Sequence, residues 1–301
     1  MIKKAQEIDI EIIKEMYAKL YSPQFVSFYF DNVFKPLNTY VIKDQGKIVS
    51  TLAVNRHGLW LKGKKINVSY ISALYTLPEY RNSALFDVLI KEVIEEMSYN
   101  DLITIVQSKS LESYAKYDFR SVFQQKNYLL SRAQIPLYPS TGIVNITNID
   151  DLAQLYHQFT YYFDGYFHRD KDYYQLKLKW LNDCGYKLIG YTNQHGQLEG
   201  YLIYDPSCNP LVVKEIIYLN SIAFLKLLSY ALNISENLII SLSNNENILK
   251  LVPTAIYNKK DYVSARLNDI ELFNRLYNSN IKNINEAFAL SGKPLFLNED
   301  Y

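Results

Sequence analysis

The sequence is poor in the residues that build disulfide frameworks and metal sites. It has only two cysteines, Cys184 and Cys208, and neither belongs to a Cys-x-x-Cys pair. Its four histidines are scattered along the 301 residues. Neither a disulfide framework nor a structural zinc site is therefore expected, and no metal is predicted as a cofactor.

Blocks of like charge and long apolar runs are also missing. The chain has 32 Lys and Arg against 31 Asp and Glu, a formal net charge of +1, which gives no support for nucleic-acid binding. No apolar run is long enough to span a bilayer, and the first residues lead into a mixed amphipathic helix rather than an uninterrupted apolar segment. We expect a cytoplasmic protein without membrane or nucleic-acid partners. A homo-oligomer is compatible with the sequence, which does not fix the oligomeric state.

What the sequence has is enough apolar material for a core and a repeated order of elements. Hydrophobic residues make up 49% of the chain and charged residues 21%, which favours a globular protein of about two domains. The first copy contains a helix, two hairpins, a helix and two more strands, at residues 10–20, 39–54, 62–77, 85–97, 102–106 and 128–130. The same order recurs at residues 186–191, 200–204, 211–219, 222–232 and 238–242.

This repetition predicts two similar domains of the α/β (α+β) class. Each would contain a mixed, mostly antiparallel sheet flanked by helices. The Pro- and Gly-containing stretch 136–142 reads as the linker between them. The predicted division is an N-terminal domain 1–135, a second domain 143–255 and a short C-terminal segment 256–301.

The most informative stretch is a strand, a tight turn and a helix start between Leu74 and Phe86. An apolar run meets Pro78, then Arg81, and then an amphipathic helix. The N-terminus of a helix presents unpaired N–H groups and positive dipole, which suit a phosphate group. An ordinary turn that binds nothing is the alternative. The second copy has no Arg and no Gly in the corresponding turn 218–222, so we expect one cofactor site, in the first domain.

Together these residues resemble the GNAT superfamily of N-acetyltransferases, whose cofactor turn has the pattern Arg-x-x-Gly-x-Gly/Ala. More closely they resemble the enhanced-intracellular-survival (Eis-type) acetyltransferases, with two tandem GNAT-like domains and a C-terminal sterol-carrier-like domain. The resemblance rests on segments 77–81, 114–119, 165–174, 198–204, 213–216 and 264–269. It implies acetyl-CoA as donor and a small cationic amine, aminoglycoside-like or polyamine-like, as acceptor. Most of the sterol-carrier-like domain is missing, and segment 256–301 resembles its remnant.

The resemblance also implies site residues. The cofactor would be held by the strand end and the turn, namely Leu74, Tyr75, Thr76, Arg81, Asn82, Ser83, Ala84, Leu85, Phe86 and Asp87. Tyr114 would protonate the departing thiolate, since the pKa of a phenol lies close to that of a thiol. In this family the terminal carboxylate can act as the base, which makes Tyr301 the candidate. Acidic residues that could line a cleft for a cationic acceptor are Asp164, Asp170, Asp172 and Glu215.

Three departures keep a second interpretation open. Ala84 stands where the family usually has Gly, Phe86 where it often has a small residue, and Asp87 places a negative charge beside the pyrophosphate. The alternative is therefore a catalytically degenerate GNAT-fold protein that acts in binding or interaction. A third interpretation is transfer of another acyl group, or transfer to a protein amine.

Overall fold

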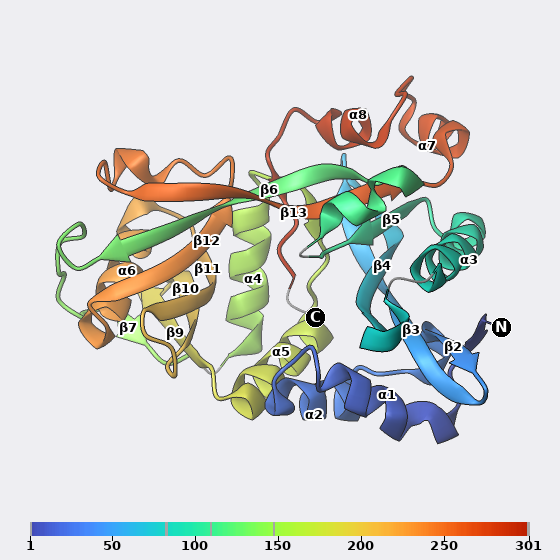
Figure 1. The fold of residues 1–301 in the computed structure, drawn as a ribbon. Helices are drawn as coiled ribbons and strands as arrows, with labels where there is room; N and C mark the ends of the chain where they lie inside the picture. Colours follow the sequence, from blue (N-terminus) through green and yellow to red (C-terminus); the bar gives the residue numbers. More distant parts are fainter. Residues whose placement is uncertain (1, 82–83, 109, 147, 300–301) are drawn as a thin grey trace. The chain divides into compact units, whose positions relative to one another are not determined.

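The computed structural model describes the chain apart from residues 1, 82–83, 109, 147 and 300–301, and it divides into two compact units (Figure 1). Unit 1 contains Met1–Val122, Asp261–Gly292 and Glu299–Tyr301. Unit 2 contains Phe123–Lys260 and Lys293–Asn298. Each unit has its own buried core.

Unit 1 is a mostly antiparallel sheet with helices packed on it. Its strands follow the order β1-β2-β3-β4-β5-β13, and only β4 and β5 are parallel, joined by the crossover helix α3. The elements are β1 (Ile2–Lys4), α1 (Ile10–Tyr17), α2 (Pro23–Asn32), β2 (Thr39–Asp44), β3 (Lys47–Leu61), β4 (Lys64–Thr76), α3 (Leu85–Asn100), β5 (Ile103–Val106), β13 (Ile256–Leu267), α7 (Ile270–Tyr277) and α8 (Ile284–Ala289). A 3₁₀ helix, η4 (Leu111–Tyr117), follows β5.

The two hairpins of this sheet turn where the sequence predicts. Gln45 and Gly46 have φ angles of 47° and 83°, and Lys62 and Gly63 have 46° and 72°. Two successive positive φ angles match the right-handed twist of the flanking strands, which is why Gly is favoured in such two-residue turns. The predicted turn between Asp44 and Lys47 is confirmed by their pairing.

Unit 2 repeats this plan. Its strands follow the order β6-β12-β11-β10-β9-β7; β11 and β12 are parallel and are joined by the crossover helix α6. The elements are β6 (Arg120–Ser131), β7 (Ile143–Val144), α4 (Ile149–Thr160), β8 (Asp164–Phe167), α5 (Lys171–Cys184), β9 (Lys187–Thr192), β10 (Leu198–Asp205), β11 (Leu211–Tyr218), α6 (Ser221–Ile234), β12 (Asn237–Ser243) and β14 (Leu295–Phe296), which pairs with β8. The predicted fold class, with mostly antiparallel sheets flanked by helices, is confirmed.

The last strand of each sheet comes from an unexpected part of the chain. The strand predicted at 128–130 lies in β6, and it pairs with β12 of unit 2 rather than closing the N-terminal domain. The strand expected in a separate C-terminal remnant lies in β13, where Ser264 pairs with Val106 of β5. The bounds of the two compact units therefore differ from those of the predicted segments 1–135, 143–255 and 256–301. The physical reason is that the edge of each sheet is completed by backbone hydrogen bonds to a segment far away in sequence.

Candidate functional site

In unit 1 the parallel strands β4 and β5 pair over a short distance and then separate. Their pairing runs from Ser69 with Thr104 to Ile71 with Val106, where β5 ends, while β4 continues to Thr76. No described strand pairs with this side of β4 beyond Ile71. The predicted residues Leu74, Tyr75 and Thr76 thus lie on a strand segment whose backbone groups on one edge are open to a ligand.

A bulge bends the same segment. Thr51 of β3 pairs with Tyr75, but Ala53 pairs with Ser72, so β4 has one extra residue here. Ala73, within the bulge, has a φ of 48°. A positive φ is unusual for alanine, and bulges re-aim backbone groups next to functional sites.

Arg81 lies at the end of this strand. Its Nε donates to the carbonyl oxygen of Thr76 at 3.2 Å, and its guanidinium carbon lies 5.6 Å from the centre of the Tyr75 ring. The side chain is exposed, so its positive charge is available at the turn. Asn82 and Ser83, also predicted in the cofactor site, lie outside the described residues.

Helix α3 begins without a side-chain cap among the described residues. Its N-cap residue, Ala84, has a φ of −72° and a ψ of 6°. Because this φ is negative, alanine replaces the family's glycine without backbone strain. In general, the first turn of an α-helix presents backbone N–H groups and the positive end of the helix dipole, so the start of α3 is suited to an anion.

Asp87 in the first turn of α3 is paired within unit 1. Its carboxylate accepts hydrogen bonds from the Lys116 ammonium and the Tyr117 hydroxyl. The hydrogen bond from Lys116, followed by that from Tyr117, lowers the pKa of Asp87. The negative charge is directed toward η4 and is offset by Lys116, which weakens the objection that Asp87 repels a pyrophosphate.

Tyr114 of η4 lies beside the start of α3. Its ring meets that of Phe86 edge-on, with centroids 5.5 Å apart, and only 3% of its surface is exposed. Burial raises the pKa of Tyr114 to about 12, a hydrogen bond with Ser108 lowers it, and the nearby Tyr21 hydroxyl raises it further. The phenol is therefore protonated at neutral pH. Its role as the acid remains a prediction, and Tyr301 lies outside the described residues.

In unit 2 the strands separate in the same way, but the start of the next helix is capped. Pairing of β11 with β12 ends at Val213 with Ile240, and β11 continues to Tyr218. Asn220, the N-cap of α6, accepts from the Ala223 N–H at 2.9 Å. This bond takes one of the donors that a phosphate would need.

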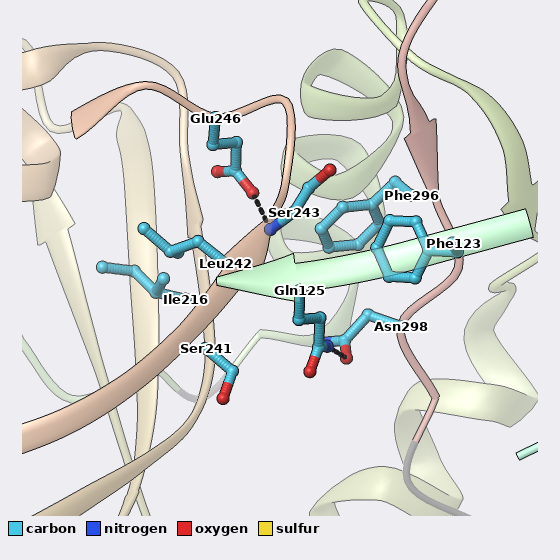
Figure 2. Close-up of a pocket in the computed structure, with 9 residues that line it drawn as sticks. All are labelled: Phe123, Gln125, Ile216, Ser241, Leu242, Ser243, Glu246, Phe296 and Asn298. Atoms are coloured by element: carbon cyan, nitrogen blue, oxygen red, sulfur yellow. Dashed lines mark hydrogen bonds between the residues drawn. The ribbon is translucent and has the colours of Figure 1, made fainter. Parts of the chain in front are cut away.

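Residues of unit 2 itself fill the space beside the separated strands (Figure 2). Phe296 and Asn298 of the segment 293–298 lie there, and Gln125 Nε2 donates to Asn298 Oδ1 at 3.1 Å. The Ser243 hydroxyl donates to the Leu295 carbonyl at 3.2 Å. The remaining cavity is about 10 Å³, the space of a single water molecule.

Sequence reasoning missed a buried ionic cluster on β11 of unit 2. Glu215, named above as a cleft residue, forms an ion pair with Arg169 at 2.8 Å and accepts a hydrogen bond from the Tyr201 hydroxyl at 2.7 Å. It also lies 3.7 Å from Lys177. Arg169 also donates to the Asn298 carbonyl at 2.7 Å. Burial raises the pKa of Glu215, but the two cations outweigh it and lower that pKa to about 2. No local sequence signal marks this cluster, since its members come from separate elements.

The other acidic candidates differ among themselves. The Asp170 carboxylate caps α5 by accepting from the Tyr173 N–H at 2.9 Å. Asp164 is buried in β8. These observations give Glu215 and Asp170 structural roles within unit 2.

Comparison with known proteins agrees with this architecture. Residues 2–122 match the family described as "Acetyltransferase (GNAT) domain". A GCN5-related N-acetyltransferase from Anabaena variabilis has a similar fold, with a TM-score of 0.74 and 18% identity over 90% of this chain and 73% of the other. Residues 2–122 of unit 1 are thus similar to a GNAT acetyltransferase domain, and the fold of such a domain suggests acyl transfer from acyl-CoA.

Two further solved structures show the same fold. Eis1 from Mycobacterium abscessus has a TM-score of 0.64 and 14% identity, over 91% of this chain and 75% of that one. The N-myristoyltransferase of Saccharomyces cerevisiae with bound myristoyl-CoA has a TM-score of 0.62 and 11% identity, over 89% and 78%. No curated protein matches the sequence. No helix of the described residues is long and apolar enough to cross a membrane.

Proposed function

We propose that this protein is an N-acetyltransferase of the tandem-GNAT, Eis-like type that moves an acetyl group from acetyl-CoA to the amine of a small molecule. One observation carries the proposal: the edge of β4 beyond its pairing with β5 leads directly to Arg81 and to the N-terminus of α3. The backbone at Leu74–Thr76 would hold the thioester arm, and the turn and α3 would hold the pyrophosphate. Unit 2, with its capped α6 and filled strand opening, would bind no cofactor.

The reaction would be a direct transfer. The neutral amine nitrogen attacks the thioester carbon, so a C–N bond forms and the C–S bond breaks. Tyr114 would supply a proton to the thiolate as it leaves, and the resulting phenolate would regain a proton that the newly formed amide nitrogen must lose. A base must first take a proton from the ammonium ion, and the Tyr301 carboxylate stays the candidate that the resemblance implies. The acetyl-CoA-dependent chemistry needs no metal.

Isothermal titration with acetyl-CoA tests the cofactor site. We expect saturable binding by the unaltered protein and an affinity about tenfold lower in Arg81→Ala, because a charged hydrogen-bonding partner of the phosphates is removed. Arg275→Ala is the matched control, since Arg275 is an exposed arginine on α7 of the same unit and is expected to change nothing.

The same titration separates the two interpretations of the chain. Absent or millimolar binding of acetyl-CoA would support the catalytically degenerate binding protein. Equal affinity in Arg81→Ala and Arg275→Ala would remove Arg81 from the proposed site.

A further inference from the structure

Figure 1 shows helices α1 and α2 side by side in unit 1. An aromatic cluster lies on these two helices, on the segment between them and on the turn after α2. Neighbouring ring centroids lie between 4.4 Å and 6.5 Å apart. The six rings are those of Tyr17, Tyr21, Phe25, Tyr29, Phe30 and Phe34. These six rings give the helical hairpin a large aromatic surface in one short segment.

This aromatic cluster packs against the bulged segment of β4. Tyr75 belongs to the same buried core as the rings, and Ala73 and Leu77 pack against it. The Tyr29 hydroxyl accepts a hydrogen bond from Asn55 Nδ2 at 3.4 Å. The rings therefore border the strand segment along which the thioester is proposed to lie.

Tyr21 connects the cluster with the proposed acid. Its ring lies 4.9 Å from that of Phe25 and 6.2 Å from that of Tyr17. Its charge when ionised also contributes, after burial, to the raised pKa of Tyr114. Tyr21 is 38% exposed and Phe25 is partly exposed, so both rings retain surface that a ligand can cover.

The carboxylates of α1 and α2 lie away from the aromatic cluster. Asp31 of α2 accepts from Ser27 on the exposed side, and Glu11 and Glu15 of α1 are exposed or partly exposed outside the aromatic core. The one cation placed over a ring of the cluster is Lys14, 5.9 Å from the centre of Phe30, among the described residues. Among the described residues of this hairpin, a ligand with several positive charges would thus find ring faces and no cluster of carboxylates beside them.

We infer that the acceptor is a monoamine with an aromatic or other apolar body, whose ammonium group rests against Tyr21 and Phe25. This inference rests on the proposed function and narrows its acceptor class, away from polyamines and aminoglycosides. Ring faces attract an ammonium ion through their quadrupole, and they bury the apolar body at the same time.

Steady-state kinetics with phenethylamine, putrescine and kanamycin test the acceptor class. We expect kcat/KM for phenethylamine to exceed that for the other two amines by about tenfold or more. Tyr21→Ala and Phe25→Ala should raise the KM for phenethylamine about threefold to thirtyfold and leave the KM for acetyl-CoA unchanged. Tyr21→Phe should retain most of the affinity, because the ring remains. Tyr99→Ala, at a tyrosine of α3 that is 84% exposed, should change neither KM.

A second readout does not depend on turnover. Phenethyltrimethylammonium carries the same cation and ring but has no nitrogen that can be acylated, and its binding is measured by calorimetry in the presence of CoA. Binding that weakens in Tyr21→Ala supports the inference even if no acetyl transfer is found, an outcome that would reject only the proposed function. Transfer that favours putrescine or kanamycin, or binding unaffected by Tyr21→Ala, overturns the inference and leaves the acetyltransferase intact.

Discussion

Replacing Arg169 or Glu215 should destabilise unit 2 far more than replacing a similar ion pair on its surface. The two side chains are 2.8 Å apart, with exposures of 0% and 1%. Removing one partner of a buried pair leaves the other charge without compensation, which costs about 3–5 kcal/mol. We expect the cost of Arg169→Met to lie near the lower end of this range, because Lys177 remains 3.7 Å from Glu215. Glu215→Gln should cost more, because two buried cations then lose the carboxylate between them.

The pKa of Glu215 gives an independent magnitude. Its fall from 4.5 to about 2 corresponds to about 3 kcal/mol of folding free energy at neutral pH. The folded protein keeps this carboxyl ionised more strongly than the unfolded chain does. The contribution is therefore complete above about pH 5 and is lost as the pH falls toward 2. At pH 3 the carboxylate-dependent difference between the unaltered protein and Glu215→Gln should have shrunk by about half.

Urea unfolding, monitored by tryptophan fluorescence, measures the loss of unfolding free energy in unit 2. The chain has two tryptophans, so Trp60→Phe leaves Trp180 as the reporter. Trp180 is 3% exposed, and the Lys177 ammonium lies 5.0 Å from its ring. Each cluster variant is compared with Lys171→Met, because the exposed pair Lys171–Asp150 has the same 2.8 Å separation.

The control should lose at most about 0.5 kcal/mol, since solvent screens an exposed pair. If Arg169→Met and Lys171→Met cost the same, or if the effect of Glu215→Gln does not decline between pH 7 and pH 3, the buried pair does not stabilise the fold as described.

Four further predictions concern the two helix N-termini and the proposed acid. Asp87→Asn removes a negative charge from the first turn of α3 and should tighten acetyl-CoA binding about twofold to fivefold in low-salt titrations; weaker binding would show that Asp87 helps to hold the cofactor turn. Asn220→Ala removes the cap of α6 and should lower the free energy of unfolding by about 1 kcal/mol in urea, with no change in acetyl-CoA affinity. Tyr114→Phe should reduce kcat about a hundredfold at unchanged KM for acetyl-CoA, and equal turnover would exclude the phenol as acid. Because the pKa of Tyr114 is raised to about 12, its ionisation should cause no loss of kcat below about pH 10; a loss near pH 8 that vanishes in Tyr114→Phe would contradict this assignment.

Local elements could be predicted from the sequence because their signals are local. The turns at Gln45–Gly46 and Lys62–Gly63 follow from glycine beside short apolar alternations, and helix α3 follows from its apolar period. The position of the candidate site on Leu74–Asp87 was also within reach, since a strand, an arginine and a helix start lie consecutively in the chain. The open edge of β4 and the bulge at Ala73 were not, because they depend on where β5 stops pairing.

Non-local pairings could not be predicted. The segments that became β6 and β13 are both plausible strands, and nothing in their own residues says which sheet each one completes. The ionic cluster was missed for the same reason. Glu215 was expected to face a cationic acceptor, but the folded chain brings Arg169 and Lys177 to it from a loop and from α5.

Strand β13 is synthesised long after β5, with which it pairs, and this order has a consequence for the nascent chain. The Asn268 side chain, at the end of β13, donates to the Asp101 carbonyl, 167 positions earlier. At roughly 5–20 residues per second, a ribosome needs on the order of ten to thirty seconds to cover that interval. Throughout this time the edge of β5 that later pairs with β13 has unpaired N–H and C=O groups. Such an edge can pair with other chains. A chaperone would therefore protect the protein most while the N-terminal half has been synthesised and β13 has not.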